Sequence, residues 1–294
     1  MMDQAAKLRE LVKERESRDK KAKKKNKAEI IAITSGKGGV GKTSLAVNMA
    51  AILQKKSKKV LIIDADLGLS NVEIMLGVTP SYTMKDLIKN NKSIEEIIIK
   101  GPYKIDFISG GNGFLEITEL SNIEREEIFI KLKKLDELYD IIIIDTGAGI
   151  SKNVISFLEI ADQILVVATS EPTSLTDAYS IIKVINEKNN KIEIGVIINR
   201  AINIAEYKKA ADIIINTSFK FLNKKISKLG FIYEDKVVRE TIYKKAPFAI
   251  YYPNSKATSC MNYIIEKVIK EKSEIKRNET ILDRMKNWLN PIGR

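Results

Sequence analysis

The sequence contains no histidine and only one cysteine, Cys260, in 294 residues. Without histidine, a Ser-His-Asp triad, a histidine general base and a histidine metal ligand are all excluded. A single cysteine excludes an internal disulfide and any Cys-x-x-Cys metal or redox motif. The chemistry of an active site must therefore come from carboxylates, lysines, hydroxyls and backbone amides.

The sequence also lacks a long apolar run. The first apolar segment, residues 30–34, is much shorter than the roughly 20 residues that span a bilayer. Charged residues from Asp3 onward leave no room for a signal peptide. With 44% hydrophobic and 30% charged residues, the composition is ordinary for one large globular domain with a buried core. These features predict a cytosolic protein.

Acidic residues are outnumbered mainly at the two ends of the chain, and the formal net charge is +12. Residues 1–27 hold 11 Lys and Arg against 5 Asp and Glu, and residues 267–294 hold 8 against 4. Residues 28–266 hold 31 against 29. This nearly neutral body argues against a surface for specific DNA binding. The basic ends suit an acidic partner or anionic lipid.

What the chain does have, from Glu29 onward, is a regular alternation of strand-length and helix-length segments. Helical patterns are clearest at residues 44–56, 122–138, 174–188 and about 256–272. Apolar runs of strand length separate them, at residues 30–34, 60–63, 105–108, 141–144, 164–168, 194–198 and 229–233.

Several of these strands are expected to be buried on both faces. The β-branched run over residues 141–144 is typical of a mainly parallel sheet covered by helices. Ser121 with Glu124, and Ser174 with Asp177, indicate helix N-terminal caps. We see no internal repeat and no second domain. The predicted fold class is α/β, with a mostly parallel β-sheet flanked by helices on both faces.

Residues 36–43 read Gly-Lys-Gly-Gly-Val-Gly-Lys-Thr and satisfy the phosphate-loop pattern G-x-x-x-x-G-K-[ST] between a predicted strand and a predicted helix. The glycines let backbone amides curl around phosphate oxygens, and the helix N-terminus adds partial positive charge. Lys42 would reach the β- and γ-phosphates, and the Thr43 hydroxyl would ligate Mg²⁺. The segment predicts a P-loop NTPase.

Aspartates follow two of the predicted strands. Asp64 and Asp66 follow the strand at residues 60–63, and Asp145 follows the strand at residues 141–144. Carboxyl ends of parallel strands meet at the crevice where nucleotides bind, and phosphoryl transfer needs a metal-side carboxylate and a group that orients water. Neighbouring glycines suit loops that move when the γ-phosphate leaves. These aspartates are candidate members of the same site.

Lys37 gives the phosphate loop the deviant Walker A signature, Lys-Gly-Gly-Val-Gly-Lys-Thr. Through it, the chain resembles the MinD/ParA class of ATPases over roughly residues 28–265. In that class the first lysine crosses the dimer interface to the phosphates held by the other subunit. The resemblance implies an enzyme that hydrolyses ATP to ADP and phosphate with Mg²⁺, and that forms a homodimer when ATP is bound.

The resemblance also implies roles for individual residues. Asp66 matches the switch I aspartate that polarises the attacking water, Asp145 matches the Walker B aspartate, and Asn199 matches the asparagine that reads adenine. Tyr233 departs from the family, which commonly has proline near the adenine. Catalytic roles are implied for Lys37, Lys42, Asp66 and Asp145; a place at or near Mg²⁺ for Thr43, Asp64 and Asp145; and ATP contacts for Gly36, Lys37, Gly38, Gly39, Val40, Gly41, Lys42, Thr43, Ser44, Asn199 and Arg200.

The single cysteine narrows the choice within the class. Cys260 alone cannot provide the two cluster-ligating cysteines of the nitrogenase iron protein, nor the Cys-x-x-Cys of the iron–sulfur scaffold ATPases. A membrane-positioning ATPase of the MinD type, a DNA-partition ATPase of the ParA type and a flagellar regulator remain. The near-neutral body and the lack of an evident helix-turn-helix disfavour DNA partition.

The last segment has an amphipathic pattern with a basic surround. A short, Trp-bearing basic helix of this kind is typical of attachment in a lipid interface, as in the MinD branch, although packing on the body or on a partner is the alternative. Two weakly bound helices in an ATP dimer would make attachment switchable through avidity. The apolar face comprises Ile281, Leu282, Met285, Trp288, Leu289 and Ile292.

The first residues of the chain help to distinguish among these three kinds of ATPase. The segment Asp3-Gln4-Ala5-Ala6-Lys7-Leu8-Arg9 resembles the D-Q-A-x-x-L-R element that opens members of the FlhG family, also called FleN or YlxH. That branch helps to set flagellar number and placement. Residues 64–71 and 171–179 also resemble it. The resemblance implies that Asp3, Gln4, Ala5, Leu8 and Arg9 bind FlhF, a flagellar GTPase of the signal-recognition-particle type, and stimulate its hydrolysis.

The sequence thus predicts three parts: a basic activator helix and linker at residues 1–27, a deviant Walker A ATPase domain at residues 28–272, and a membrane-targeting segment at residues 273–294. We expect a cytoplasmic ATPase switch that attaches reversibly to anionic lipids on the inner face of the cell membrane. Flagellar C-ring proteins are further possible partners. A division-site or DNA-partition ATPase is the alternative.

Overall fold

The computed structural model describes residues 27–66, 71–110, 113, 116 and 120–270. The residues predicted to bind a GTPase, at 3–9, and those predicted to bind lipid, at 281–289, lie outside this part of the chain. Both assignments therefore stay predictions. In the described part, no helix is long and apolar enough to cross a membrane.

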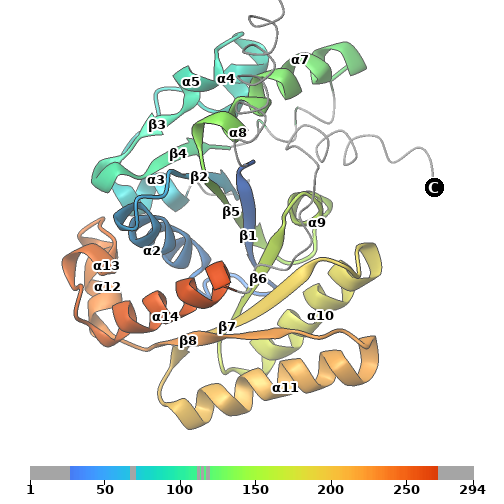
Figure 1. The fold of residues 1–294 in the computed structure, drawn as a ribbon, viewed down its shortest axis with the longest axis vertical. Helices are drawn as coiled ribbons and strands as arrows, with labels where there is room; N and C mark the ends of the chain where they lie inside the picture. Colours follow the sequence, from blue (N-terminus) through green and yellow to red (C-terminus); the bar gives the residue numbers. More distant parts are fainter. Residues whose placement is uncertain (1–26, 67–70, 111–112, 114–115, 117–119, 271–294) are drawn as a thin grey trace, which may run out of the picture.

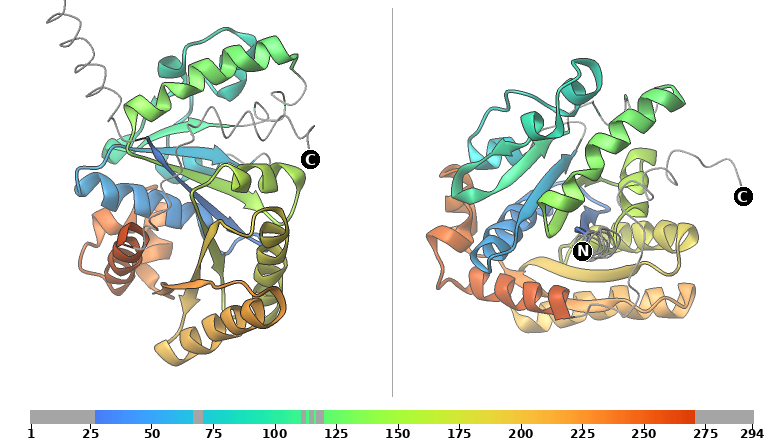
Figure 2. Two further views of the ribbon diagram at one scale, coloured as in Figure 1. Left: turned by 45° about the vertical axis from the view of Figure 1, so that its right-hand side comes forward. Right: turned by 45° about the horizontal axis from the view of Figure 1, so that its top comes forward.

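One eight-stranded sheet runs through the molecule in the order β3-β4-β2-β5-β1-β6-β7-β8, and helices cover both of its faces (Figures 1 and 2). All pairings are parallel except that of β3 with β4. The predicted fold class is therefore confirmed. The strands are β1 (Glu29–Ser35), β2 (Val60–Ala65), β3 (Ile99–Lys100), β4 (Asp106–Ser109), β5 (Ile141–Ala148), β6 (Gln163–Ala168), β7 (Glu193–Ala201) and β8 (Ser227–Tyr233).

Two hydrophobic cores lie against the two faces of the sheet. Alternation along β1 shows the division, because Ile30 and Ala32 belong to one core and Ile31 and Ile33 to the other. This continuous burial explains why the strands have no polar face. The first core packs under α4 (Met84–Lys89), α5 (Ile94–Ile97), α7 (Asn122–Lys133), α8 (Leu135–Leu138), α9 (Lys152–Glu159), α10 (Pro172–Lys188) and α11 (Ile204–Leu222).

The second core is covered by the helix that follows the phosphate loop and by the last helices of the domain (Figure 1). Asn48 ties these together, because its side-chain oxygen accepts a buried hydrogen bond from the backbone amide of Ala249 at 2.9 Å. The helices on this side are α2 (Lys42–Lys55), α3 (Asn71–Leu76), α12 (Lys236–Tyr243), α13 (Phe248–Tyr251) and α14 (Lys256–Lys270), with the 3-10 turn η1 (Pro102–Lys104).

Two sequence-based expectations about helices need correction. Ser174 is not a helix cap: α10 begins at Pro172, and the Ser174 hydroxyl instead accepts a hydrogen bond from the amide of Thr169 at 2.9 Å. The segment predicted as one helix at residues 122–138 is divided at Lys134, where the backbone hydrogen bonds tighten to three-residue spacing. The cap at Ser121 is confirmed, with Glu124 completing the capping box.

Candidate functional site

The phosphate loop joins β1 to α2 at the carboxyl edge of the sheet. Gly41 precedes the helix with φ of 99°, in the left-handed region that favours glycine. A Cβ at this position would also collide with the side-chain amide of Asn199. A Cβ at Gly36 would collide with the backbone of Asp177 in α10. The loop is therefore shaped by contacts with β7 and α10 as well as by its own sequence.

Lys42 lies in the first turn of α2 and is buried. Its Nζ donates a hydrogen bond to the Ser35 hydroxyl at 3.0 Å, and that hydroxyl donates in turn to the Lys37 carbonyl at 2.7 Å. Burial lowers the pKa of Lys42, and the nearby carboxylates of Asp145 and Asp66 partly oppose this shift. An anion at the loop would restore favourable charge pairing for this ammonium group.

Asp145 is fully buried near the end of β5. Within the described residues, neither of its carboxylate oxygens has a well-oriented hydrogen-bond partner. Burial raises the pKa of Asp145 to about 7; the Thr43 hydroxyl and Lys42 lower it, whereas the charge of Asp64 raises it. A buried, unsatisfied carboxyl beside a hydroxyl is a costly arrangement in isolation, and a cation would satisfy it.

Asp64 is the Cα partner of Asp145 on the adjacent strand. It is buried, and its two oxygens accept hydrogen bonds from the amides of Val72 at 3.0 Å and Asp66 at 3.2 Å. Burial raises its pKa to about 6, against the opposing effect of those two amides. Asp64 therefore fixes the start of α3 and the turn after β2, beside the position predicted for the metal.

Asp66 follows β2 and is half-buried. One of its oxygens accepts a hydrogen bond from the side-chain amide of Asn71 at 3.0 Å. A Cβ built on Gly147, beyond Asp145 on β5, would lie 3.5 Å from the other oxygen. Asp66 thus lies between the segment that follows β2 and the part of β5 beyond Asp145, where a water-orienting carboxylate is needed.

Asn199 and Arg200 hold the far side of the phosphate loop. The buried side-chain amide of Asn199 donates to the Val40 carbonyl at 2.7 Å, and the Arg200 guanidinium donates to the Gly39 carbonyl at 2.9 Å. Arg200 adopts φ of 58°, and its backbone amide donates to the Asn199 oxygen at 2.9 Å. Both residues contact the loop; in this arrangement they brace its backbone.

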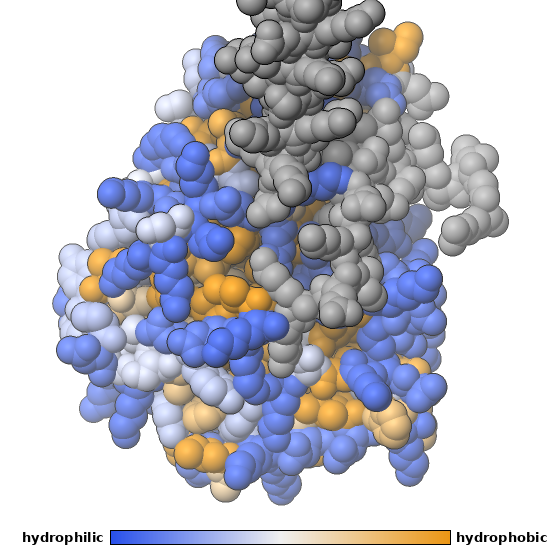
Figure 3. Space-filling model, in the orientation of Figure 1, coloured by the Kyte–Doolittle hydropathy of each residue, from blue (hydrophilic) through white to orange (hydrophobic). Residues whose placement is uncertain are grey.

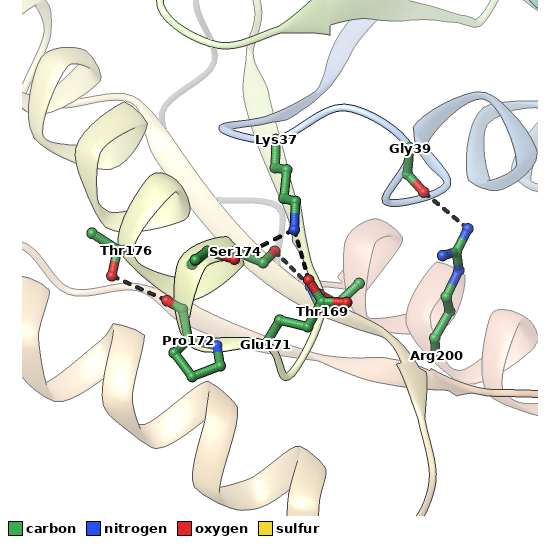
Figure 4. Close-up of polar contacts among 9 residues, drawn as sticks. Lys37, Gly39, Thr169, Glu171, Pro172, Ser174, Thr176 and Arg200 are labelled. Carbon is green, nitrogen blue, oxygen red and sulfur yellow. Dashed lines mark hydrogen bonds and ion pairs between the residues drawn. The ribbon is translucent and has the colours of Figure 1, made fainter.

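Lys37 points away from the loop interior toward the start of α10 (Figure 4). Its Nζ pairs with the Glu171 carboxylate at 2.7 Å and donates to the Thr173 hydroxyl at 3.3 Å. The pairing lowers the pKa of Glu171. Both side chains of the ion pair are exposed to a large extent, at 43% and 63%. An exposed pair of this kind is weak and exchanges easily, so Lys37 can be redirected to another anion.

The residues at this edge fit a nucleotide and a magnesium ion. Added Cβ atoms at Gly38 and Gly39 would meet nothing within 4 Å, so the loop backbone is open on its outer side. The oxygens of Asp145 need a partner, and the Thr43 hydroxyl lies beside them. The described residues contain no group of three acidic or cysteine side chains that could hold a metal alone. Phosphate oxygens would complete the coordination.

The structure brings together the predicted residues Lys42, Thr43, Asp64, Asp66 and Asp145, which interact through hydrogen bonds or charge. Asn199, Arg200 and Lys37 lie at the rim of the loop. Sequence reasoning gave no role to three residues that contact them, namely Ser35, Asn71 and Glu171. Two signals were available: Ser35 and Glu171 lie at or just after the ends of β1 and β6, and Asn71 and Glu171 fall within the two stretches that resemble the FlhG branch.

Comparison with known proteins places this site in a family. Residues 28–204 match the model of the AAA domain family. The antiactivator FleN of Pseudomonas aeruginosa is 32% identical over 82% of this chain and 86% of its own length. The flagellum site-determining protein YlxH of Helicobacter pylori is 38% identical over 60% of this chain and 59% of its own length.

Among solved structures, the septum site-determining protein MinD of Pyrococcus horikoshii, in complex with Mg-ADP, superimposes with a TM-score of 0.68. It is 26% identical, and the match covers 86% of this chain and all of the MinD chain. The shared sheet and the phosphate loop with its aspartates agree with this similarity. The chain belongs to the FleN/YlxH branch of the MinD/ParA family and is a P-loop ATPase.

Proposed function

We propose that this ATPase is a switch that regulates flagellar number or placement, that pairs with a second copy when it binds ATP, and that attaches reversibly to the membrane. Lys37 is the observation that carries the proposal, because its ammonium group lies at the rim of the phosphate loop in an exposed, exchangeable ion pair. The similarity to FleN and YlxH supports the flagellar role.

The roles of the site residues follow from their positions. When bound, Mg²⁺ and ATP supply the transferable phosphoryl group and a cation that stabilises its negative charge. Lys42 would exchange the Ser35 hydroxyl for a phosphate oxygen. Thr43 and the unsatisfied Asp145 would hold the metal side. Asp66 would orient the attacking water, and Asp64 would keep the turn carrying Asp66 in place.

Pairing of two copies would be controlled at Lys37. In the described conformation its ammonium group is held within its own chain by Glu171 and Thr173. The β- and γ-phosphates offer a more concentrated negative charge than one exposed carboxylate. Binding of ATP on a facing copy would therefore draw Lys37 across the interface. After hydrolysis the contact would weaken and Lys37 would return to Glu171.

Membrane attachment would use residues 273–294, whose apolar stripe includes Trp288. One such segment binds lipid weakly, and two in an ATP dimer bind with avidity. The test is co-sedimentation of the full chain with vesicles of phosphatidylglycerol and phosphatidylcholine. We expect binding with ATP and a loss of binding in Trp288→Glu. Unchanged sedimentation of that variant would reject the lipid role of this segment.

The flagellar role is tested through the predicted partner. Residues 1–27 would bind a flagellar GTPase of the signal-recognition-particle type and stimulate its hydrolysis. The experiment measures turnover of GTP by that GTPase with the full chain and with a chain lacking residues 1–27. We expect stimulation only by the full chain, with equal ATP hydrolysis by both. Equal stimulation by the shortened chain would dismiss the role of this segment.

A further inference from the structure

The carboxyl-terminal end of α11 presents two exposed phenylalanines on either side of a lysine. Phe219 is 54% exposed and Phe221 is 65% exposed. The Nζ of Lys220 lies 5.3 Å from the centre of the Phe221 ring. Apolar atoms are visible over this end of α11 at the lower right of Figure 3, surrounded by hydrophilic surface. The two phenylalanines are two positions apart on the helix, so their rings leave it on opposite sides of Lys220, and each adds exposed apolar area at this end of α11.

The end of α11 is held rigidly by its neighbours. Asn223 ends the helix in the left-handed conformation, with φ of 50°. The buried Lys224 donates hydrogen bonds to the carbonyls of Asn190 at 2.6 Å and Ile192 at 2.7 Å, which fixes the turn to the loop before β7. The backbone that carries the two rings is therefore already fixed, and binding of a partner does not have to order this segment.

The charge around these rings favours an anionic partner. Residues 213–233 contain four lysines and no aspartate or glutamate. Lys224 is buried and Lys228 pairs with Asp212, whereas Lys220 and Lys225 are exposed. Exposed aromatic rings with flanking lysines are typical of surfaces that enter the headgroup region of an anionic bilayer, because the rings bury apolar area while the ammonium groups stay among the phosphates.

The position of the patch agrees with a lipid partner. Lys267, in the last turns of α14, donates a hydrogen bond to the Lys228 carbonyl at 2.8 Å, near the start of β8. The chain therefore continues past Lys270, toward residues 273–294, from the same edge of the sheet at which α11 ends. This is the amino-terminal edge of the parallel strands, opposite the edge that carries the phosphate loop. A bilayer contacted here would leave the nucleotide face free.

We propose that Phe219, Lys220, Phe221 and Lys225, here named the α11 patch, form a second contact with an anionic lipid bilayer. The inference rests on the membrane attachment proposed above. The amphipathic segment would tether the chain, and the α11 patch would seat the folded domain against the surface in one orientation. Two contacts on one chain raise the affinity through effective concentration.

The first test compares vesicle binding by the full ATP-loaded chain and by the double variant F219S/F221S. Partial insertion of two rings predicts a loss of roughly tenfold in affinity when they are removed. Ile123→Ser is the matched control, because Ile123 is 76% exposed on α7, away from the end of α11. Thermal melting checks that each variant folds. Equal affinity of F219S/F221S and the control would overturn the proposal.

The second test separates this inference from the proposed function. Trp288 is the single tryptophan, so F221W in a Trp288→Phe background reports only on the α11 patch. We expect a blue shift of its emission on phosphatidylglycerol vesicles and quenching by brominated lipids. If this variant sediments with the vesicles but shows neither the blue shift nor the quenching, the α11 patch does not contact lipid, and attachment through residues 273–294 still stands. A wild-type chain that does not sediment would refute both.

Discussion

At the scale of single residues, hydrolysis should depend most on Asp66. Its carboxylate lies between the turn after β2 and Gly147, and its support comes from Asn71. We expect Asp66→Ala to slow ATP turnover by about 10²–10⁴-fold, the usual contribution of a positioned general base or water-orienting group. Binding of ATP should change little, because Lys42 and the loop amides hold the phosphates. Turnover and nucleotide affinity, measured together, check both points. An undiminished rate would remove Asp66 from the mechanism.

The raised pKa of Asp145 should make the stability of the nucleotide-free protein depend on pH. Its pKa is raised from 3.8 to about 7 in the folded chain, so the folded state holds this proton more tightly than the unfolded state. The contribution to stability is present at low pH and is lost as pH rises between those two values. The total loss is on the order of 2–4 kcal/mol. Asp64, with its pKa raised to about 6, acts in the same direction.

The measurement for this second prediction is the free energy of unfolding across that pH window without nucleotide. Asp145→Asn removes the titrating group and keeps its shape, so its stability should fall less steeply than that of the wild type. Parallel profiles of the two proteins would show that Asp145 does not titrate in this range.

At the scale of elements, β7 braces the phosphate loop through Asn199. Asn199→Ala leaves the buried Val40 carbonyl without its donor, which costs about 1–3 kcal/mol of stability. It should also weaken ATP binding, because the loop loses a fixed position. Chemical denaturation and nucleotide titration measure the two effects. Asn216→Ala, on the exposed face of α11, is the control. A wild-type denaturation midpoint for Asn199→Ala would contradict the brace.

Most of the strands could be predicted from the sequence, because continuous apolar runs mark strands that are buried on both faces. The seven predicted strands lie within the observed β1, β2 and β5–β8, and with a one-residue offset in β4. The two-residue β3 has too little pattern to be recognised. Ser174 was misassigned because Pro172, two residues earlier, can itself begin a helix. The local sequence alone could not show whether the helix begins at Pro172 or after Ser174.

In the functional site too, some features could be predicted from the local sequence and others required the tertiary structure. The phosphate loop and its aspartates follow from spacing and from strand ends. The contact of Lys37 with Glu171 does not, because it depends on where β6 and α10 lie relative to the loop. The contact of Lys42 with Ser35 depends on how the loop itself folds between β1 and α2. The bracing contacts of Asn199 and Arg200 with the loop carbonyls likewise required the tertiary structure.

At the scale of the whole molecule, we infer that the two edges of the sheet have separate functions. The carboxyl edge carries the nucleotide site and Lys37, and the opposite edge carries the α11 patch and the exit toward residues 273–294. Raising the salt concentration should therefore weaken vesicle binding several-fold, through screening of the lysines, and should affect ATP turnover much less. Sedimentation and turnover along one salt series check this. Equal sensitivity of both would contradict the separation.

The central claim is that ATP joins two copies of this chain through Lys37. Light scattering of the hydrolysis-deficient Asp66→Ala chain, with and without ATP, tests it most directly. We expect the 33.1 kDa monomer without nucleotide, twice that mass with ATP, and a monomer in both conditions once Lys37→Ala is added. A chain that stays monomeric with saturating ATP, or one that still pairs without Lys37, would contradict the claim.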